Sequence, residues 1–160
     1  MKYNVLGNFN EILTDDIGEG TRIANFCFIG KDVKIGKNVK IGNFCEINRG
    51  TVIGDNCVIN PYCVFNDGTI IGNDCIFGGQ VMTADEKYMT TDFTKIERTP
   101  CKIGNHVKVG QGARLVCCEI GDNSIIGTAA VVMKDVPTNE VWVGTPAKKL
   151  RNVSDMELKL

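Results

Sequence analysis

The sequence predicts an all-β fold in which short parallel strands and tight turns wind into a β-helix. The main observation is a six-residue repeat that runs without interruption through eleven units, from Ile17 to Met82. Its first position is Ile in nine units and Phe in the other two, Phe65 and Phe77. Its second position is Gly in seven units, and the chain holds 18 glycines in 160 residues. This pattern is typical of a strand of about three residues followed by a tight turn.

The positions of the repeat predict which side chains form the core. Side chains alternate along a strand, so positions five and one of consecutive units point inward on either side of an outward position six. Position five holds only small or β-branched residues, which fit beside the large Ile or Phe of position one. Three units make one triangular coil of 18 residues. Stacked coils then pair as parallel strands about 4.8 Å apart.

The repeat stops after Met82 and returns later in the chain. It resumes as IGNHVK and VGQGAR from Ile103, and after a one-residue deletion as IGDNSI and IGTAAV from Ile120. We expect coils over about 17–133, interrupted by an excursion over 83–100. The excursion is polar and has no period. Long loops of this kind are often functional, although a solvated surface loop is an alternative.

The rest of the chain completes a single domain over 1–160. We expect residues 134–160 to cap the last coil, because a solenoid must cover its open end. Within this cap, SDMELKL at 154–160 predicts a short C-terminal helix with Ser154 as its N-cap.

Composition and charge exclude several classes of function. A net charge of −1 gives no basic excess to neutralise phosphates, so we expect no nucleic-acid partner. No run approaches 18 apolar residues, so we expect no membrane span. The amino terminus, MKYNVLGNFNEILTDD, lacks a basic segment followed by an apolar one and does not resemble a signal peptide. Together these features favour a cytoplasmic location.

The eight cysteines follow the same repeat. Free Cys packs as a small hydrophobe, which suits the inward fifth position. We expect this position for Cys27, Cys45, Cys57, Cys63, Cys75, Cys101 and Cys118. The sequence has no Cys-x-x-Cys pair, so we expect no metal site, and reduced thiols fit a cytoplasmic chain.

The outward sixth position becomes apolar in the second half of the first repeat block. It reads Val52, Val58, Val64, Ile70, Ile76 and Met82. An exposed apolar surface of this kind indicates a contact with another subunit. Two alternatives are the general preference of strands for Val and Ile, and coverage by the excursion.

The C-terminal segment AAVVMKDVPTNEVWVGTPAKKL, together with the hexads, resembles the hexapeptide-repeat acyltransferases. This resemblance implies a left-handed parallel β-helix, a homotrimer and acetyl-CoA as co-substrate. Small residues would let a pantetheine arm approach the backbone, and lysines would meet the phosphates. The implied cofactor-binding residues are Gly112, Gly127, Ala129, Ala130, Lys134 and Lys148. A tail that only covers the open coil is the alternative for this segment.

The single histidine limits the kind of acyl transfer. Family members that acetylate hydroxyl groups use a histidine base, because a hydroxyl must lose its proton during attack. His106 lies at the fourth position of IGNHVK, where we expect a surface corner. Members of the γ-type carbonic anhydrases need three histidines for zinc, which this chain lacks. A neutral amine needs no such base, so the resemblance favours the nucleotide-sugar N-acetyltransferases.

The excursion begins with a partial match to the loop of those enzymes. It reads Met82-Thr83-Ala84-Asp85-Glu86, and we expect Asp85 or Glu86 to orient the amine and accept its proton. The departing thiolate is an alternative acceptor. Asn60, Asn66 and Asp67 replace expected turn residues and are candidate substrate contacts, although Asn and Asp also suit corners for backbone reasons.

Three functions remain open from the sequence. The first is acetyl-CoA-dependent N-acetylation of a nucleotide-linked amino-deoxysugar. The second is acetylation of another acceptor, a sugar hydroxyl or a small amine. The third is a non-catalytic hexapeptide scaffold subunit, which binding of coenzyme A would distinguish from the first two.

Overall fold

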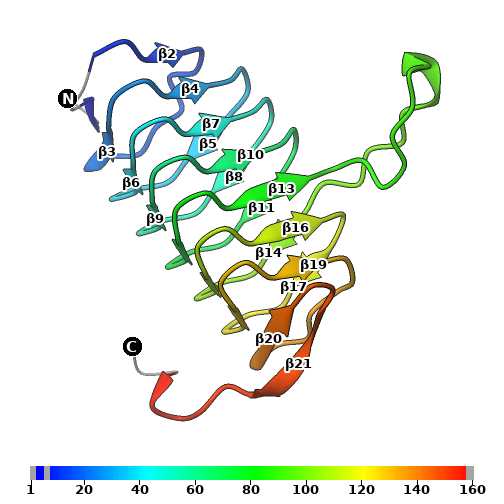
Figure 1. The fold of residues 1–160 in the computed structure, drawn as a ribbon. Helices are drawn as coiled ribbons and strands as arrows, with labels where there is room; N and C mark the ends of the chain where they lie inside the picture. Colours follow the sequence, from blue (N-terminus) through cyan, green and yellow to red (C-terminus); the bar gives the residue numbers. More distant parts are fainter. Residues whose placement is uncertain (1–2, 6–7, 158–160) are drawn as a thin grey trace.

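The computed structural model describes residues 3–5 and 8–157, and it confirms the predicted parallel β-helix (Figure 1). Short strands stack into three sheets, which we call faces A, B and C. Face A comprises β1 (Tyr3–Val5), β3 (Thr21–Ile23), β6 (Lys40–Ile41), β9 (Val58–Ile59), β12 (Ile76–Phe77), β15 (Lys108–Val109), β18 (Ile125–Ile126), β20 (Glu140–Gly144) and β21 (Ala147–Asn152). Face B comprises β2 (Glu11–Ile12), β4 (Phe28–Ile29), β7 (Glu46–Ile47), β10 (Val64–Phe65), β13 (Met82–Ala84), β16 (Arg114–Val116) and β19 (Val131–Val132). Face C comprises β5 (Lys34–Ile35), β8 (Val52–Ile53), β11 (Ile70–Ile71), β14 (Lys102–Ile103) and β17 (Glu119–Ile120).

The strand register follows the repeat, including its deletion. In face A, Val58 of β9 pairs with Ile76 of β12, which lies 18 residues further on. In the later coils, Arg114 of β16 pairs with Val131 of β19, which lies 17 residues further on. The corner before Cys118 is one residue shorter than a corner of the regular repeat. The inward side chains that follow it therefore still lie above the inward side chains of the preceding coil.

The core is the interior of the prism. The Ile and Phe side chains of position one and the small side chains of position five are buried throughout the coils. Phe65 and Phe77 meet edge to face, with ring centroids 5.0 Å apart. All seven cysteines that the repeat places inward are buried and free, which confirms their packing role.

Three corners join the faces, and most corners end in a residue with positive φ. Corner AB holds Phe9, Phe26, Phe44, Tyr62, Gln80, Gly112 and Ala129 at this position. Corner BC holds Asp32, Gly50, Gly68 and Cys117. Corner CA holds Gly20, Asn38, Asn56, Asp74, His106, Asn123 and Asn139. Residues of one corner stack coil upon coil, so each corner has its own chemistry.

The excursion starts later than the repeat predicts. Thr83 is buried and continues the coil in β13, where it pairs with Leu115. Its hydroxyl lies 3.1 Å from that of Thr69 and accepts from the backbone N–H of Asn66. A threonine therefore takes the place of Ile at position one, and this substitution hides the last strand from the pattern. The chain leaves corner BC after Asp85 and projects away from the prism (Figure 1).

The C-terminal cap contains a β-hairpin, which the sequence did not predict. β20 and β21 pair antiparallel, and Trp142 packs against the end of the core. The expected helix at 154–160 lies partly outside the described residues. Within them, the Glu157 carboxylate accepts from the backbone N–H of Ser154 and the Ser154 hydroxyl accepts from the backbone N–H of Glu157, the pattern of an N-terminal capping box.

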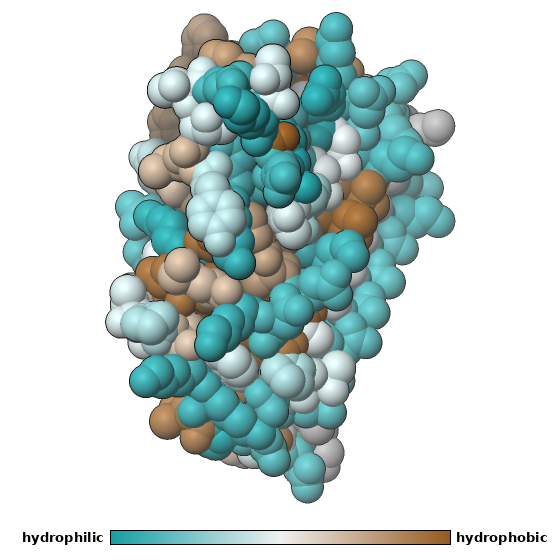
Figure 2. All heavy atoms as spheres, turned by 90° about the vertical axis from the view of Figure 1, so that its right-hand side faces the viewer, coloured by the Kyte–Doolittle hydropathy of each residue, from teal (hydrophilic) through white to brown (hydrophobic). Residues whose placement is uncertain are grey.

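The outward apolar residues of the sixth position form a belt around the prism. Successive units lie on successive faces, so Val52 and Ile70 lie on face C, Val58 and Ile76 on face A, and Val64 and Met82 on face B. Figure 2 shows small hydrophobic patches separated by hydrophilic side chains on the side that carries the excursion. Within the described residues, no helix has the length and apolar character needed to cross a membrane.

Close coil stacking makes the turn glycines sensitive to substitution. A Cβ at Gly54 would lie 2.6 Å from the backbone of Gly72 in the next coil, whereas one at Gly79 would meet only the carbonyl of Pro61, at 3.2 Å. We expect Gly54→Ala to lower the free energy of unfolding by about 1–3 kcal/mol, as other overpacked substitutions do. Gly79→Ala is the matched control and should cost less. Denaturant unfolding measures both, and equal stability of the two variants would contradict the stacking geometry.

Candidate active site

Corner BC carries an open cleft beside the base of the excursion. Its lining combines residues of three coils with both ends of the loop: Asn48, Asn66, Asp67, Ala84, Asp85, Glu86, Met89 and Arg98. The structure therefore brings together four of the residues that the sequence singled out, namely Asn66, Asp67, Asp85 and Glu86. It places the fifth, Asn60, at corner AB, where its side-chain amide donates to the carbonyl of Phe77 at 2.8 Å.

Asp85 and Arg98 close the base of the loop. The guanidinium of Arg98 donates to Asp85 at 2.5 Å, and the side-chain amide of Asn66 donates to the same carboxylate at 3.1 Å. The backbone of Asp85 accepts from Thr99, and Glu86 forms an antiparallel bridge with Arg98. The hydrogen bond and charge of Asp85 raise the pKa of Arg98, which therefore stays a cation. We call this set of contacts the loop clasp.

The two predicted carboxylates have different surroundings. The Asp85 side chain is 4% exposed and committed to the loop clasp, whereas that of Glu86 is 27% exposed. Glu86 lies 3.6 Å from the other guanidinium nitrogen of Arg98. Of the two, Glu86 is the carboxylate that a molecule in the cleft can reach.

Sequence reasoning missed Arg98 and Asn48. Asn48 occupies the same hexad position as Asn66 one coil earlier, so the 18-residue spacing was a usable signal. Arg98 lies in a segment without period, and only the fold shows that it returns to Asp85. Asp67 has a further partner, Arg49, at 3.6 Å on the surface.

A cysteine also lies at corner BC, in the coil after the loop. Cys117 is half-buried, and its thiol lies 3.6 Å from the carbonyl of Ala84. Burial raises the pKa of the Cys117 thiol. A thiol of this kind is a poor nucleophile, because the thiolate is the reactive form. The site therefore favours direct transfer over an acyl-cysteine intermediate.

Corner AB holds the small residues that the resemblance assigned to the cofactor. At Gly112 a Cβ would meet only the Cα of Ala129, at 4.0 Å, so this part of the corner leaves its backbone accessible. Ala129 is exposed in the next coil. Gly127 is covered by Val143 of the C-terminal hairpin, whose Cγ1 would lie 2.7 Å from a Cβ. Ala130 is fully buried, so its small side chain fills the core.

The two predicted lysines flank the C-terminal end of the prism. Lys134 is exposed in the corner after β19, and Lys148 is exposed on β21. The adjacent Lys149 is paired with Glu140 at 2.7 Å, and Arg151 is paired with Glu157. Lys134 and Lys148 have no ion pair within the described residues. They are therefore available to an anionic ligand.

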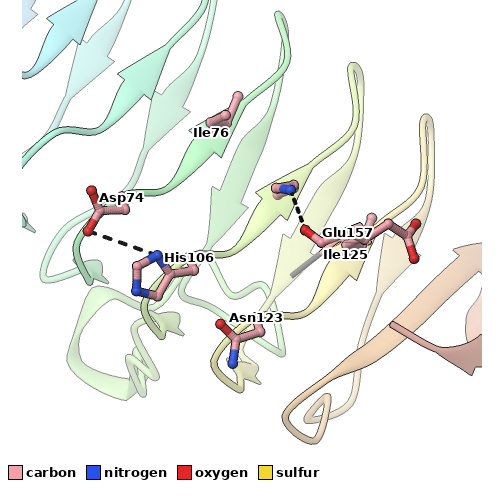
Figure 3. Close-up of a pocket in the computed structure, with 7 residues that line it drawn as sticks. Asp74, Ile76, His106, Asn123, Ile125 and Glu157 are labelled. Atoms are coloured by element: carbon pink, nitrogen blue, oxygen red, sulfur yellow. Dashed lines mark hydrogen bonds and ion pairs between the residues drawn. The ribbon is translucent and has the colours of Figure 1, made fainter. Parts of the chain in front are cut away.

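The lone histidine lies at corner CA, as the repeat predicts. Its side chain is 59% exposed and its Nδ1 lies 3.9 Å from a carboxylate oxygen of Asp74 (Figure 3). Asp74 also accepts from Asn56, and Asn123 donates to Asn139, so His106 belongs to a row of stacked polar corner residues. His106 and Asp74 line a pocket at this corner, and Figure 3 shows Ile76, Ile125 and Glu157 in the same pocket. Within the described residues, no group of three His, Cys, Asp or Glu side chains could hold a metal ion.

The family model for the bacterial transferase hexapeptide (six repeats) matches residues 16–49 and 50–84. Over 55 residues the chain is 40% identical to galactoside O-acetyltransferase of Escherichia coli K12, a match that covers 34% of this chain and 25% of that protein. The chain thus spans about a quarter of the length of the curated relatives it matches.

Solved structures share the fold over most of the chain. A hexapeptide-repeat acetyltransferase from Vibrio cholerae is 25% identical, with a TM-score of 0.62 over 79% of this chain and 74% of its own. AntD, an N-acyltransferase from Bacillus cereus solved with dTDP-4-amino-4,6-dideoxyglucose and coenzyme A, is 17% identical, with a TM-score of 0.72 over 98% of this chain and 84% of its own. The repeat match and the shared coils show that the chain has the fold of the hexapeptide-repeat acyltransferases and resembles them in sequence over residues 16–84.

Proposed function

We propose that the protein transfers the acetyl group of acetyl-CoA to the amino group of a nucleotide-linked amino-deoxysugar. The observation that carries this proposal is the cleft at corner BC, which presents the Glu86 carboxylate beside amide and guanidinium groups. The histidine of the chain lies at a different corner, in a row of structural polar contacts. This arrangement suits an amine acceptor, since a neutral amine attacks a thioester without prior loss of a proton.

Corner AB supports acetyl-CoA as the acyl donor. The accessible backbone at Gly112 and Ala129 offers a path for a narrow pantetheine arm, and the exposed lysines Lys134 and Lys148 suit the phosphates. A second structure of the Vibrio cholerae relative holds acetyl coenzyme A, and AntD was solved with coenzyme A. Both share the fold of this chain.

In the proposed reaction, the amine nitrogen attacks the thioester carbonyl carbon, a C–N bond forms and the C–S bond breaks. Glu86 orients the amine and accepts its proton, and the departing thiolate is the other acceptor available. A backbone amide of a coil stabilises the developing oxyanion. Asp85 is a positioning residue, because its contacts to Arg98 and Asn66 fix the loop that carries Glu86. Asn66 and Asp67 contribute polar groups toward the sugar.

A homotrimer is part of the proposal. The projecting loop exposes three large hydrophobic side chains, Tyr88, Met89 and Phe93, and Met89 is 94% exposed. Because the loop projects away from the prism (Figure 1), these side chains suit contact with a neighbouring copy, which would cover them and complete the cleft that Met89 lines. Val64 and Met82 supply further apolar surface on face B.

A second candidate function is acetylation of a sugar hydroxyl. The match to a galactoside O-acetyltransferase and the position of His106 Nδ1 3.9 Å from a carboxylate oxygen of Asp74 favour it, because a neighbouring carboxylate can orient an imidazole. Under this alternative His106 would serve as the base.

Removal of the Glu86 carboxylate tests the proposed site. We expect Glu86→Gln to lower kcat more than tenfold, and the double change Asp85→Ala, Glu86→Ala to do so at least as strongly, because general-base assistance and amine orientation are lost. Release of free coenzyme A with amino-sugar nucleotides as acceptors measures the rate. Glu97→Gln, on the same loop, is the matched control. Wild-type rates in Glu86→Gln would refute its role.

Substitution of His106 separates the two acceptors. We expect His106→Asn to keep kcat within about twofold, since Asn tolerates the positive φ of this corner and the amine needs no histidine. The same release assay, run with amino and hydroxyl sugar acceptors, gives the answer. A loss of two or more orders of magnitude would instead favour the hydroxyl alternative.

A further inference from the structure

Corner AB carries a ladder of four stacked aromatic rings. Phe9, Phe26, Phe44 and Tyr62 occupy the same corner position in successive coils, with neighbouring centroids 5.0–5.1 Å apart and ring planes within 9° of parallel. All four are exposed. The ladder ends at Tyr62, because the next coil places Gln80 at this position.

A hollow lies at this end of the ladder. Its lining is Asn60, Pro61, Tyr62, Gly78, Gly79, Gln80 and Gln111. Gly79 lies at the bottom of the hollow and has no side chain to fill it; a Cβ there would contact only the carbonyl of Pro61. The wall carries three side-chain amides, and those of Gln80 and Gln111 make no hydrogen bond within the described part of the chain. An aromatic face with free amides around it suits a flat, polar, heteroaromatic ring.

A cation lies beside this hollow. The guanidinium of Arg114 donates to the carbonyls of Gln80 at 2.6 Å and of Gly112 at 2.8 Å. One of its nitrogens makes both contacts, so the other nitrogens remain for an anion. The site thus offers a stacking surface at Tyr62 and, two coils further on, the positive charge of Arg114.

We propose that the end of the aromatic ladder is a nucleotide-binding subsite, in which the base stacks on Tyr62, the amides of Gln80 and Gln111 meet its polar edge, and Arg114 meets the phosphates. This inference rests on the proposed function only for the choice of nucleotides. The base belongs either to the nucleotide-linked sugar or to the nucleotide half of coenzyme A, and both present the same chemistry to the hollow.

Isothermal titration without acetyl-CoA tests the subsite. The probes are UDP, dTDP, adenosine 3′,5′-bisphosphate and, as a ligand without a base, pyrophosphate. We expect at least one nucleotide to bind more tightly than pyrophosphate. Tyr62→Ala should weaken that nucleotide by roughly 5- to 150-fold, the range for loss of one base–aromatic stack, and leave pyrophosphate unchanged.

Two variants control for effects on folding. Phe26→Ala removes a ring from the middle of the ladder, away from the hollow, and should keep nucleotide affinity. Tyr62→Phe keeps the ring and should also keep it. The inference is overturned if no nucleotide binds more tightly than pyrophosphate, or if Tyr62→Ala and Phe26→Ala behave alike.

The outcome is independent of catalysis. Tighter binding of UDP or dTDP assigns the subsite to the acceptor, and tighter binding of the adenosine ligand assigns it to the acyl donor. A protein that binds a nucleotide through Tyr62 but releases no coenzyme A would retain the subsite and lose the proposed function.

Discussion

The stacking of one coil on the next in fixed register is the constraint on which the rest of the structure depends. Each coil adds one strand to each face, and backbone hydrogen bonds of 2.7–3.3 Å hold it to the neighbouring coil. Residues at equal repeat positions therefore lie above one another at a corner. A corner can therefore carry a row of similar side chains: aromatic in the first four coils of corner AB, and amide or carboxylate in most coils of corner CA.

The same constraint explains where binding and catalytic side chains can lie in this fold. The interior is too narrow for a ligand, because Ile, Phe and small side chains fill it completely. Binding groups must lie at the corners, where side chains point outward and glycines expose the backbone. Corner BC also lets the chain leave the coil and return, and the loop clasp between Asp85 and Arg98 offsets part of the entropy of closing that loop. The same contacts between Asp85 and Arg98 thus stabilise the loop and fix the position of Glu86, on which the catalytic proposal depends.

Most of the fold could be predicted because the repeat is local. The inward Ile, Phe and Cys residues, the effect of the deletion before Cys118 and the corner position of His106 all follow from counting in sixes. Other features needed the 18-residue period of the coil. The aromatic ladder was visible as Phe26, Phe44 and Tyr62 at equal spacing, and the apolar belt on three faces follows from the same count.

Two residues could not be predicted from the repeat. Thr83 was hidden because a hydroxyl replaced an alkyl group in the core, and Arg98 was hidden because it returns to the prism from a segment without period. The C-terminal hairpin was missed because its motif was interpreted as a cofactor signature rather than as paired strands.

Binding of acetyl-CoA at corner AB is the central claim, and isothermal titration tests it most directly. The account predicts a dissociation constant in the range of roughly micromolar to submillimolar. In the double variant Lys134→Ala, Lys148→Ala, affinity should fall about tenfold or more as charge-assisted contacts to phosphate are lost. The double variant Lys34→Ala, Lys37→Ala removes the same charge from the opposite end of the prism and should bind as the wild type does. Absence of binding at millimolar acetyl-CoA would contradict the account and leave a non-catalytic scaffold as the better explanation of this chain.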